Sequence, residues 1–323
     1  MNNKNNSPQL PEELRSFSPV TVIGAGVIGI SWTALFLAKG LEVRVNDVRP
    51  DLEEVVYKGL EQMIPTLKEL GLPTEGLKDR LIIEKNIERA LDGAAVVQEN
   101  GPERIAFKQE LYAQIEQFVS KDTLLLSSSS SLKASDIAEK MDTPERMLIG
   151  HPFNPPHLVP LVEIVPGKNT ASGAVDRAVA FYKALGKNPL ILKKEIAGFV
   201  ANRLQAALFR EAIHLVMEEV VSVKDLDEIV TSSIGLRWAA GGPFLTFQLG
   251  GGQGGFPAFL KHLGPVLEGL WDQLGEPRFD DATVQTLSDL SASSYGEIPQ
   301  MELKENRDSR QLSVLHALKE KSK

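Results

Sequence analysis

The sequence predicts an α/β fold, with a doubly wound parallel β-sheet in its N-terminal part and an all-α C-terminal part. Short apolar, β-branched runs alternate with helical patterns through the first 195 residues, as is typical of a parallel sheet covered by helices. A glycine turn joins the first of these runs to the first helical pattern. From residue 197 onward, strand signals nearly vanish and amphipathic helical patterns replace them.

The N-terminal elements follow in order. Residues 1–18 are polar, and we expect them to form a flexible leader without the apolar core of a signal peptide. Residues 19–23 are β-branched and bounded by glycine, which predicts a buried strand. After the glycine turn we expect a helix over about residues 32–39, and the alternating residues 41–47 predict a second strand. These pieces form a β-turn-α-β unit.

The middle of the chain continues this alternation. Residues 52–70 favour a helix with long charged faces, which we expect to be exposed and to project, with residues 71–79 as its bend. Residues 105–118 predict another helix. The remaining strands of the sheet are expected at residues 81–83, 95–98, 123–126, 147–149, 161–165 and 188–192.

The C-terminal part shows helical sequence patterns in place of strand patterns. Residues 199–221 form one long amphipathic pattern in which Val200, Leu204 and Leu208 recur at helical spacing. The glycine-rich run 250–255 follows no predicted strand and contains no lysine, so it predicts a flexible loop and not a phosphate cradle.

Length and composition set further limits. The 323 residues suggest two domains, and we place their boundary near Glu195, with a sheet domain over residues 19–195 and a helical domain over residues 196–323. The absence of cysteine excludes disulfides, thiol nucleophiles and cysteine zinc sites. A net charge of −8 disfavours a large nucleic-acid surface, and no apolar run has the length of a membrane span. We therefore expect a cytoplasmic protein without a nucleic-acid or membrane partner.

A dinucleotide-binding pattern occupies residues 24–29, which read G-x-G-x-x-G between the first strand and the first helix. Gly24 permits the tight turn, Gly26 lets the backbone approach a pyrophosphate, and Gly29 lets helix and strand pack closely. The helix N-terminus favours the phosphate charge. Asp47 ends the second strand, where its carboxylate can accept both ribose hydroxyls. A purely structural glycine turn is the alternative, but the full context predicts a Rossmann-type site for NAD.

The choice between NAD and NADP depends on two residues. Asp47 would repel the 2′-phosphate of NADP, which favours NAD. Arg49 lies two residues further on, and a nearby arginine can accommodate that phosphate. The sequence leaves open how far Arg49 relaxes the preference.

Two later segments follow predicted strands, at the sheet edge where ligands bind in folds of this kind. They are the serine run 127–131 and the segment 150–163, in which His151 begins H-x-F-N-P and Glu163 follows twelve residues later. A G-F-x-x-N-R turn then spans residues 198–203. In this order and spacing, the segments resemble those of the 3-hydroxyacyl-CoA dehydrogenase superfamily, over about residues 19–265.

The resemblance implies a catalytic set of Ser130, His151, Glu163 and Asn202. The family has an asparagine before its serine pair, and this chain has Ser128 there, which we expect to loosen contacts around the nicotinamide. The glycine motif and the resemblance together imply these cofactor-side residues: Gly24, Gly26, Val27, Ile28, Gly29, Asp47, Glu99, Glu103, Lys108, Ser128 and Asn154.

The residues themselves suit this chemistry. Oxidation of an alcohol needs a base for the hydroxyl proton, and histidine titrates near neutrality. Glu163 lies in an apolar strand, where a lone carboxylate is costly unless a partner such as the His151 imidazole is beside it. Ser130 and Asn202 can donate hydrogen bonds to the substrate oxygen. Taken singly, each residue also fits a purely structural role. The serine run fits a polar loop and Glu163 fits a structural ion pair. Asn202 fits a helix-start residue and His151 fits a core histidine. We expect no metal, because His151 lacks further ligands at a metal spacing.

Within the superfamily, the chain is most similar to the branch of L-gulonate 3-dehydrogenase, lambda-crystallin and L-carnitine dehydrogenase, on residues 98–99, 160–166 and 235–239. The resemblance favours a small free L-3-hydroxy acid, gulonate-like first and carnitine-like second, oxidised to the 3-keto acid. Arg237 would bind its carboxylate beside Trp238, unless Arg237 is an ordinary surface residue. The alternatives are an L-3-hydroxyacyl-CoA dehydrogenase and a non-catalytic, crystallin-like or NAD-sensing protein; the acid and the physiological direction stay open.

We also expect a homodimer joined through the C-terminal helices. The resemblance implies a dimer, and the helical part is rich in apolar residues that would mark an interface if they form one exposed patch. The residues in question are Phe244, Leu245, Phe247, Leu249, Phe256 and Phe259.

Overall fold

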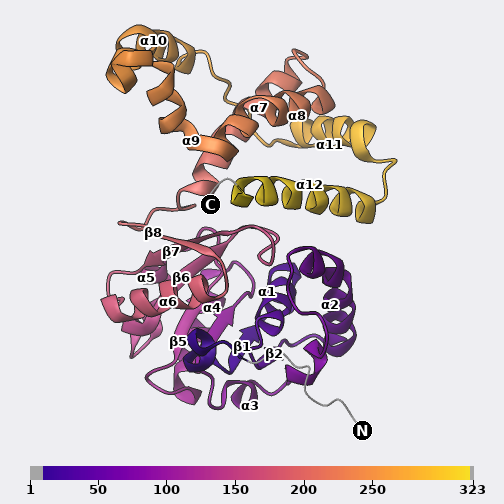
Figure 1. Cartoon of the computed structure of the whole chain (residues 1–323), viewed down its shortest axis with the longest axis vertical. Coiled ribbons are helices and arrows are strands. Elements are labelled where there is room, and N and C mark those ends of the chain that lie inside the picture. The colour runs from indigo at the N-terminus through magenta and orange to yellow at the C-terminus, as the bar shows by residue number, and fades with distance from the viewer. Residues whose placement is uncertain (1–9, 321–323) are drawn as a thin grey trace. The chain divides into compact units, whose positions relative to one another are not determined.

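The computed structural model describes residues 10–320 and divides after Asn202 into two compact units (Figure 1). The N-terminal unit holds all strands found among the described residues, and the C-terminal unit is built from helices. Both parts of the predicted fold class are therefore confirmed.

The N-terminal unit is organised around one sheet of eight strands in the order β3-β2-β1-β4-β5-β6-β7-β8. Neighbouring strands are parallel except at one pair, since β7 runs antiparallel to β6. The expectation of a wholly parallel sheet is wrong at this pair, because the short connection at residues 153–160 cannot make the crossover that parallel strands need. The strands are β1 Val20–Ile23, β2 Val43–Asn46, β3 Leu81–Ile83, β4 Val96–Glu99, β5 Leu124–Ser127, β6 Met147–Pro152, β7 Leu161–Pro166 and β8 Asn188–Ile191.

Helices cover both faces of this sheet, and each face has its own apolar core. One core packs α1, α2 and α6 on the sheet, and the other packs α3, α4 and α5. The helices are α1 Val27–Ala38, α2 Leu52–Glu69, α3 Ile87–Leu91, α4 Ile105–Phe118, α5 Ala134–Ile137 and α6 Ser172–Ala184, with short 3₁₀ turns at Glu12–Phe17, Leu77–Arg80, Ala138–Lys140 and Pro144–Arg146. Helix α1 begins five residues earlier than expected, because the glycine turn leads directly into it.

Two expectations for the N-terminal unit are corrected. Of the predicted flexible leader, residues 1–9 lie outside the described residues, but Leu14 and Phe17 are buried, and the Phe17 ring packs 5.2 Å from that of Phe181. Residues 12–17 are therefore part of the core. Helix α2 does not project, since Leu52, Val56, Leu60, Met63 and Leu67 form a buried face against the core.

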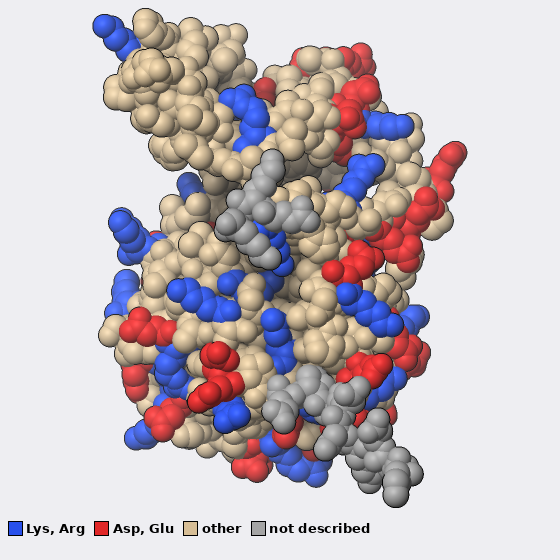
Figure 2. All heavy atoms as spheres, in the orientation of Figure 1, with Lys and Arg blue, Asp and Glu red and all other residues tan. Residues whose placement is uncertain are grey.

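The C-terminal unit consists of α7 Ala201–Met217, α8 Val223–Ser232, α9 Ile234–Gly250, α10 Gly255–Trp271, α11 Asp281–Tyr295 and α12 Gln300–Glu320, with a 3₁₀ turn at Gly252–Gly254. Helix α9 is kinked at Gly242, which has a φ of 62° and stands directly before Pro243. In α8, α9 and α11 no side chain is buried. Over α9 and α10 the visible surface is almost free of charged residues (Figure 2), because only Arg237, Lys261 and Glu268 are charged there.

Within residues 10–320, none of the helices combines the length and the apolar character that a membrane crossing requires.

Candidate active site

The glycine turn between β1 and α1 has the shape of a pyrophosphate site. Gly24 has a φ of +92°, and a Cβ at Gly29 would lie 1.9 Å from the Gly24 carbonyl oxygen, so neither position tolerates a side chain. A Cβ at Gly26 would meet nothing within 4 Å, which leaves open space beside the first turn of α1. Val27 in that turn is 64% exposed. The turn therefore fits the phosphates of a dinucleotide, with backbone N–H groups directed at them.

Asp47 lies at the end of β2, next to this turn. Its Oδ2 accepts a hydrogen bond from the Ala25 N–H at 2.7 Å, and its Oδ1 accepts one from the Arg49 N–H at 3.0 Å. The Arg49 guanidinium points to Asp51, to which it donates two hydrogen bonds at 2.8 and 3.1 Å. Arg49 is thus engaged by a carboxylate two residues away.

Glu99 and Lys108, expected at the nicotinamide ribose, are 0% and 1% exposed. Lys108 Nζ donates to both Glu99 oxygens at 2.7 and 2.8 Å, and Ser127 Oγ donates to Oε2 at 2.6 Å. The Gly101 N–H donates to Oε1. The buried pair thereby braces the ends of β4 and β5, and almost none of its own surface is exposed.

Glu103 shapes the serine loop from the adjacent turn. Its Oε1 accepts hydrogen bonds from the Ser129 hydroxyl at 2.6 Å and from the N–H groups of Ser130 and Ser131 at 3.0 and 2.9 Å. Partial burial would raise the pKa of the Glu103 carboxyl, but these hydrogen bonds and the charge of Lys108 hold it below its ordinary value. The ionised carboxylate therefore orders the loop that carries Ser130.

Ser128 is held more firmly than the sequence suggested. Its hydroxyl accepts from Trp32 Nε1 at 3.2 Å and from Gln98 Nε2 at 3.0 Å, and donates to Asn100 Oδ1 at 2.7 Å. Gln98 in turn accepts a hydrogen bond from the Tyr182 hydroxyl at 2.7 Å. One donor and two acceptors are all that a hydroxyl offers, so Ser128 leaves nothing unsatisfied and ties the loop to α1 and β4.

His151 and Glu163 lie directly opposite each other on the antiparallel strands β6 and β7. His151 Nδ1 and Glu163 Oε2 are 2.8 Å apart, and the two residues are only 3% and 2% exposed. Glu163 Oε1 accepts the N–H groups of Val200 and Ala201 at 3.0 and 3.1 Å. This register accounts for the twelve-residue spacing, because the chain leaves β6 after Pro152 and returns in β7 so that Glu163 pairs with His151.

The surroundings keep Glu163 ionised. Burial alone would raise the pKa of this carboxyl, but the hydrogen bonds with His151 and with the Ala201 and Val200 N–H groups leave it below its ordinary value. An ionised Glu163 takes the proton-bearing nitrogen of the imidazole as its partner. This pairing favours the tautomer with the proton on His151 Nδ1, in which Nε2 is unprotonated.

The remaining candidates are only partly brought together. Asn202 donates from Nδ2 to the Ser130 carbonyl oxygen at 3.0 Å, so the serine loop and the start of α7 are joined. Asn154 lies exposed in the loop that follows β6. Arg237 and Trp238 belong to α9 in the C-terminal unit, where Trp238 is 40% exposed. Among the described residues, Arg237 forms no ion pair.

Sequence reasoning missed the aromatic residues around His151. The rings of Phe153 and Phe199 lie 5.1 and 5.3 Å from the imidazole, and both phenylalanines follow His151 in the sequence. Both phenylalanines stand inside segments that had been singled out for their polar residues, H-x-F-N-P and G-F-x-x-N-R. The sequence signal that could have identified them was the position of each phenylalanine inside a segment that also holds polar site residues.

Comparisons with known proteins point to one family. The family model "3-hydroxyacyl-CoA dehydrogenase, NAD binding domain" matches residues 19–196, and the model of the C-terminal domain of the same family matches residues 198–284. An L-carnitine dehydrogenase of Streptomyces coelicolor is 43% identical over 270 residues, which are 84% of each chain. A 3-hydroxyacyl-CoA dehydrogenase of Gibberella moniliformis is 40% identical over 314 residues, 95% of this chain and 96% of the relative.

Solved structures agree. The fold is similar to that of 5-formyl-3-hydroxy-2-methylpyridine 4-carboxylic acid 5-dehydrogenase, described as an NAD⁺ dependent dismutase. The two structures align with a TM-score of 0.78 at 28% identity, over 93% of this chain and 98% of the other.

Proposed function

This chain belongs to the 3-hydroxyacyl-CoA dehydrogenase family and is an NAD-dependent oxidoreductase, and we propose that it oxidises the 3-hydroxyl of a small L-3-hydroxy acid with His151 as the base. The observation that carries the proposal is the buried hydrogen bond between His151 Nδ1 and Glu163 Oε2. It leaves the imidazole Nε2 as a proton acceptor, which the oxidation of an alcohol requires.

Each residue of the site then has a distinct task. NAD supplies the acceptor of the hydride when it is bound. His151 Nε2 takes the proton of the substrate hydroxyl, and Glu163 stabilises the imidazolium that results. The Ser130 hydroxyl and the Asn202 amide donate hydrogen bonds to the substrate oxygen as it becomes a carbonyl. Glu103 keeps Ser130 in place through the loop backbone.

The substrate class follows from the relatives as well as from the residues. Several curated relatives are named L-carnitine dehydrogenase, which puts a carnitine-like acid ahead of the gulonate-like acid that the sequence favoured. An L-3-hydroxyacyl-CoA is the second candidate, since the relative from Gibberella moniliformis carries that name at 40% identity. Arg237, with Trp238 beside it, is our candidate for the substrate carboxylate.

A substrate panel tests the proposal. The protein is incubated with NAD and, in separate reactions, with L-carnitine, L-gulonate, L-3-hydroxybutyrate and 3-hydroxybutyryl-CoA, and the absorbance of NADH is followed. We expect the highest kcat/KM with one of the free acids. Turnover of the thioester alone would assign the chain to the acyl-CoA reaction, and no turnover of any compound would favour a non-catalytic role.

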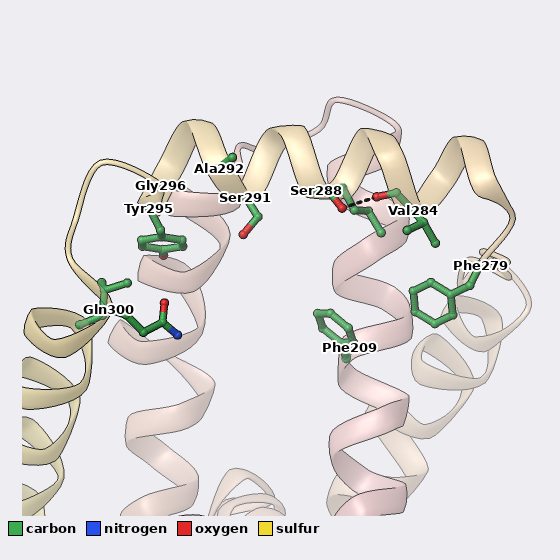
Figure 3. Close-up of a pocket in the computed structure, with 11 residues that line it drawn as sticks. Phe209, Phe279, Val284, Ser288, Ser291, Ala292, Tyr295, Gly296 and Gln300 are labelled. Carbon is green, nitrogen blue, oxygen red and sulfur yellow. Dashed lines mark hydrogen bonds between the residues drawn. The ribbon is translucent and has the colours of Figure 1, made fainter. Parts of the chain in front are cut away.

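We further propose that the enzyme works in the cytoplasm as a homodimer joined through its C-terminal unit. Apolar side chains remain exposed along α9, where Phe244, Leu245 and Leu249 are 75%, 51% and 71% exposed. A groove of about 780 Å³ also opens between α7, α11 and α12, with the rings of Phe209, Phe279 and Tyr295 at its wall (Figure 3). A second copy of the chain is the occupant that would cover these surfaces.

A further inference from the structure

We propose that Phe199 is a positioning residue, which holds the turn at residues 198–202 in the form that fixes Glu163 and, through it, His151. The inference rests on the proposed role of His151 as the base. Three observations carry it: the backbone conformation of Phe199, the packing of its ring and the hydrogen bonds made by the turn that it begins.

The backbone of Phe199 is in the left-handed region, with a φ of 50°. This region disfavours residues with a Cβ, and aromatic residues are uncommon in it. Gly198 before it has a φ of 74°, which glycine adopts freely. A bulky residue keeps such a conformation only when its surroundings impose it, and strain of this kind gathers at functional sites.

The packing of the ring supplies that constraint. Phe199 is 0% exposed and belongs to the apolar core between the sheet and α4, together with Val165 of β7 and Ile149 of β6. Its ring centroid lies 5.3 Å from the His151 imidazole, at an interplanar angle of 55°. The same side chain therefore anchors the turn in the core and contacts the proposed base.

The two residues that follow Phe199 donate the hydrogen bonds of this turn to Glu163. The N–H groups of Val200 and Ala201 stand at the start of α7, where helical N–H groups have no partner within the helix. Both donate to Glu163 Oε1, at 3.0 and 3.1 Å, which leaves Oε2 to His151 Nδ1 at 2.8 Å. Each carboxylate oxygen thus has a fixed partner, and the carboxylate cannot rotate without losing one of them.

The next residue of the same turn is Asn202, whose amide donates to the Ser130 carbonyl oxygen. A shift of the turn would therefore move Asn202 and release Glu163 together. A leucine at position 199 would keep the site apolar, but it would remove the ring that contacts His151 and much of the packing that holds the left-handed backbone.

Kinetics of Phe199→Leu provide the first test. We expect kcat to fall by about tenfold or more, because small misplacements of catalytic groups are costly, while NADH binding stays unchanged. Phe36→Leu is the matched control, since Phe36 is also 0% exposed but lies in α1, in the other core. An equal loss of kcat in both variants would overturn the proposal, as would an unchanged kcat in Phe199→Leu. Phe199→Met serves in the same way if Phe199→Leu does not fold.

A double-mutant cycle with Glu163→Gln separates positioning from general packing. If Phe199 acts through Glu163, the loss caused by Phe199→Leu shrinks to less than about twofold in the Glu163→Gln background. Losses that multiply in the double variant would overturn the proposal, because they would show that Phe199 acts independently of the carboxylate.

Nitrogen NMR of the histidine rings, recorded without substrate, makes the test independent of turnover. We expect the His151 proton on Nδ1 in the parent protein and a mixture of tautomers in Phe199→Leu. The same tautomer in both proteins would overturn the positioning role. If no hydroxy acid is turned over but the tautomer changes, Phe199 keeps its role and only the proposed function fails.

Discussion

At the scale of single residues, the site depends on two carboxylates, Glu163 and Glu103, and each of them accepts several hydrogen bonds from defined donors. Glu163 divides its oxygens between the imidazole and the start of α7, and Glu103 gathers the N–H groups of the serine loop. Ionised carboxylates that accept several hydrogen bonds are strong organisers, because charge-assisted hydrogen bonds are short and directional. Ser130 and His151 are therefore oriented by the carboxylates of Glu103 and Glu163, which accept hydrogen bonds from them.

Replacing His151 tests the base directly. We expect His151→Gln to lower kcat by about a hundredfold or more, because an amide cannot accept the hydroxyl proton, while NADH still binds at the glycine turn. Steady-state kinetics and NADH fluorescence measure the two properties. His262→Gln on the exposed side of α10 is the control. A His151→Gln variant with near-normal turnover would rule out this residue as the base.

The pair Arg49–Asp51 bears on cofactor choice. We expect kcat/KM to be higher with NAD than with NADP, since Asp47 repels a 2′-phosphate. Hydrogen bonds from Arg49 hold the pKa of Asp51 below its ordinary value, so the pair stays charged at neutral pH. Asp51→Asn should free Arg49 and raise the NADP/NAD ratio of kcat/KM by up to about fivefold, the worth of an exposed ion pair.

The control for this prediction is Glu53→Gln, which removes a neighbouring exposed carboxylate at the start of α2. An equal change of the ratio in both variants would mean that general surface charge, and not Arg49, sets it. A parent protein that uses NADP as well as NAD would show that Asp47 does not select the cofactor.

Arg237 is the proposed reader of the substrate carboxylate. Arg237→Met should cost about 1.5–3 kcal/mol in kcat/KM for a free hydroxy acid, the scale of a hydrogen bond to a charged group. The cost should be much smaller for a neutral ester of the same acid, and NAD affinity should not change. Equal losses on the charged and the neutral substrate would assign Arg237 a structural role.

The sequence was a good guide to residues whose chemistry is visible in their type. The glycines, Asp47, His151 and Glu163 stand in motifs with fixed spacing, and the structure brings Ser130, Asn202 and the His151–Glu163 pair to one edge of the sheet. Burial was harder to foresee, because Glu99 and Lys108 neutralise each other through a contact between β4 and α4. The role of Phe199 depends on a backbone angle that no composition rule predicts.

At the scale of elements, local patterns predicted best where periodicity decides the structure. Helix α4 spans Ile105–Phe118, as expected from its pattern. The direction of β7 was missed because it depends on the length of a connection and not on the strand's own residues. The burial of α2 was missed because the prediction rested on its charged faces and not on its apolar stripe, in which Leu52, Val56, Leu60, Met63 and Leu67 recur at helical spacing.

The connection between β6 and β7 is held by Lys187, just before β8, and this predicts a pH dependence of stability. Lys187 Nζ donates to the carbonyl oxygens of Pro156 and Val159. Burial, reinforced by the charge of Lys39, lowers the pKa of Lys187 from 10.5 to about 7. Between about pH 7 and pH 10.5, Lys187 holds its proton in the unfolded chain but has lost it in the folded protein. The contribution of Lys187 to the free energy of unfolding therefore increases as the pH rises through this range.

Urea unfolding measures this effect. The free energy of unfolding of the parent, relative to Lys187→Met, should rise between about pH 7 and pH 9.5 by at most about 1.4 kcal/mol per pH unit. Below about pH 7 the difference should be flat, since both states then hold the proton. Lys193→Met, at an exposed position after β8, is the control. A difference that stays flat above pH 7 as well would show that Lys187 remains charged in the folded protein.

At the scale of the whole molecule, the two units differ in how completely they bury their apolar residues. The N-terminal unit has two closed cores, one on each face of its sheet. In the C-terminal unit, large apolar side chains stay exposed, among them Phe244 and Leu249 in α9, Trp271 in α10 and Phe279 before α11. The amphipathic patterns predicted these helices, and among the described residues much of their apolar surface stays exposed within one chain.

A homodimer through the C-terminal unit is the expected consequence, and single substitutions can test it. Sedimentation at micromolar concentration should show a dimer for the parent protein, because stable interfaces bury about 1,200–2,000 Å² of largely complementary surface. Phe244→Glu and Phe279→Glu place a charge on side chains that are 75% and 71% exposed within one chain, so they should leave the fold intact and shift the protein towards monomer. Phe118→Glu, at the exposed end of α4 in the N-terminal unit, makes the same chemical change and should leave the dimer unaffected. A monomeric parent would contradict the dimer, and a parent dimer that resists both C-terminal substitutions would place its interface elsewhere on the molecule.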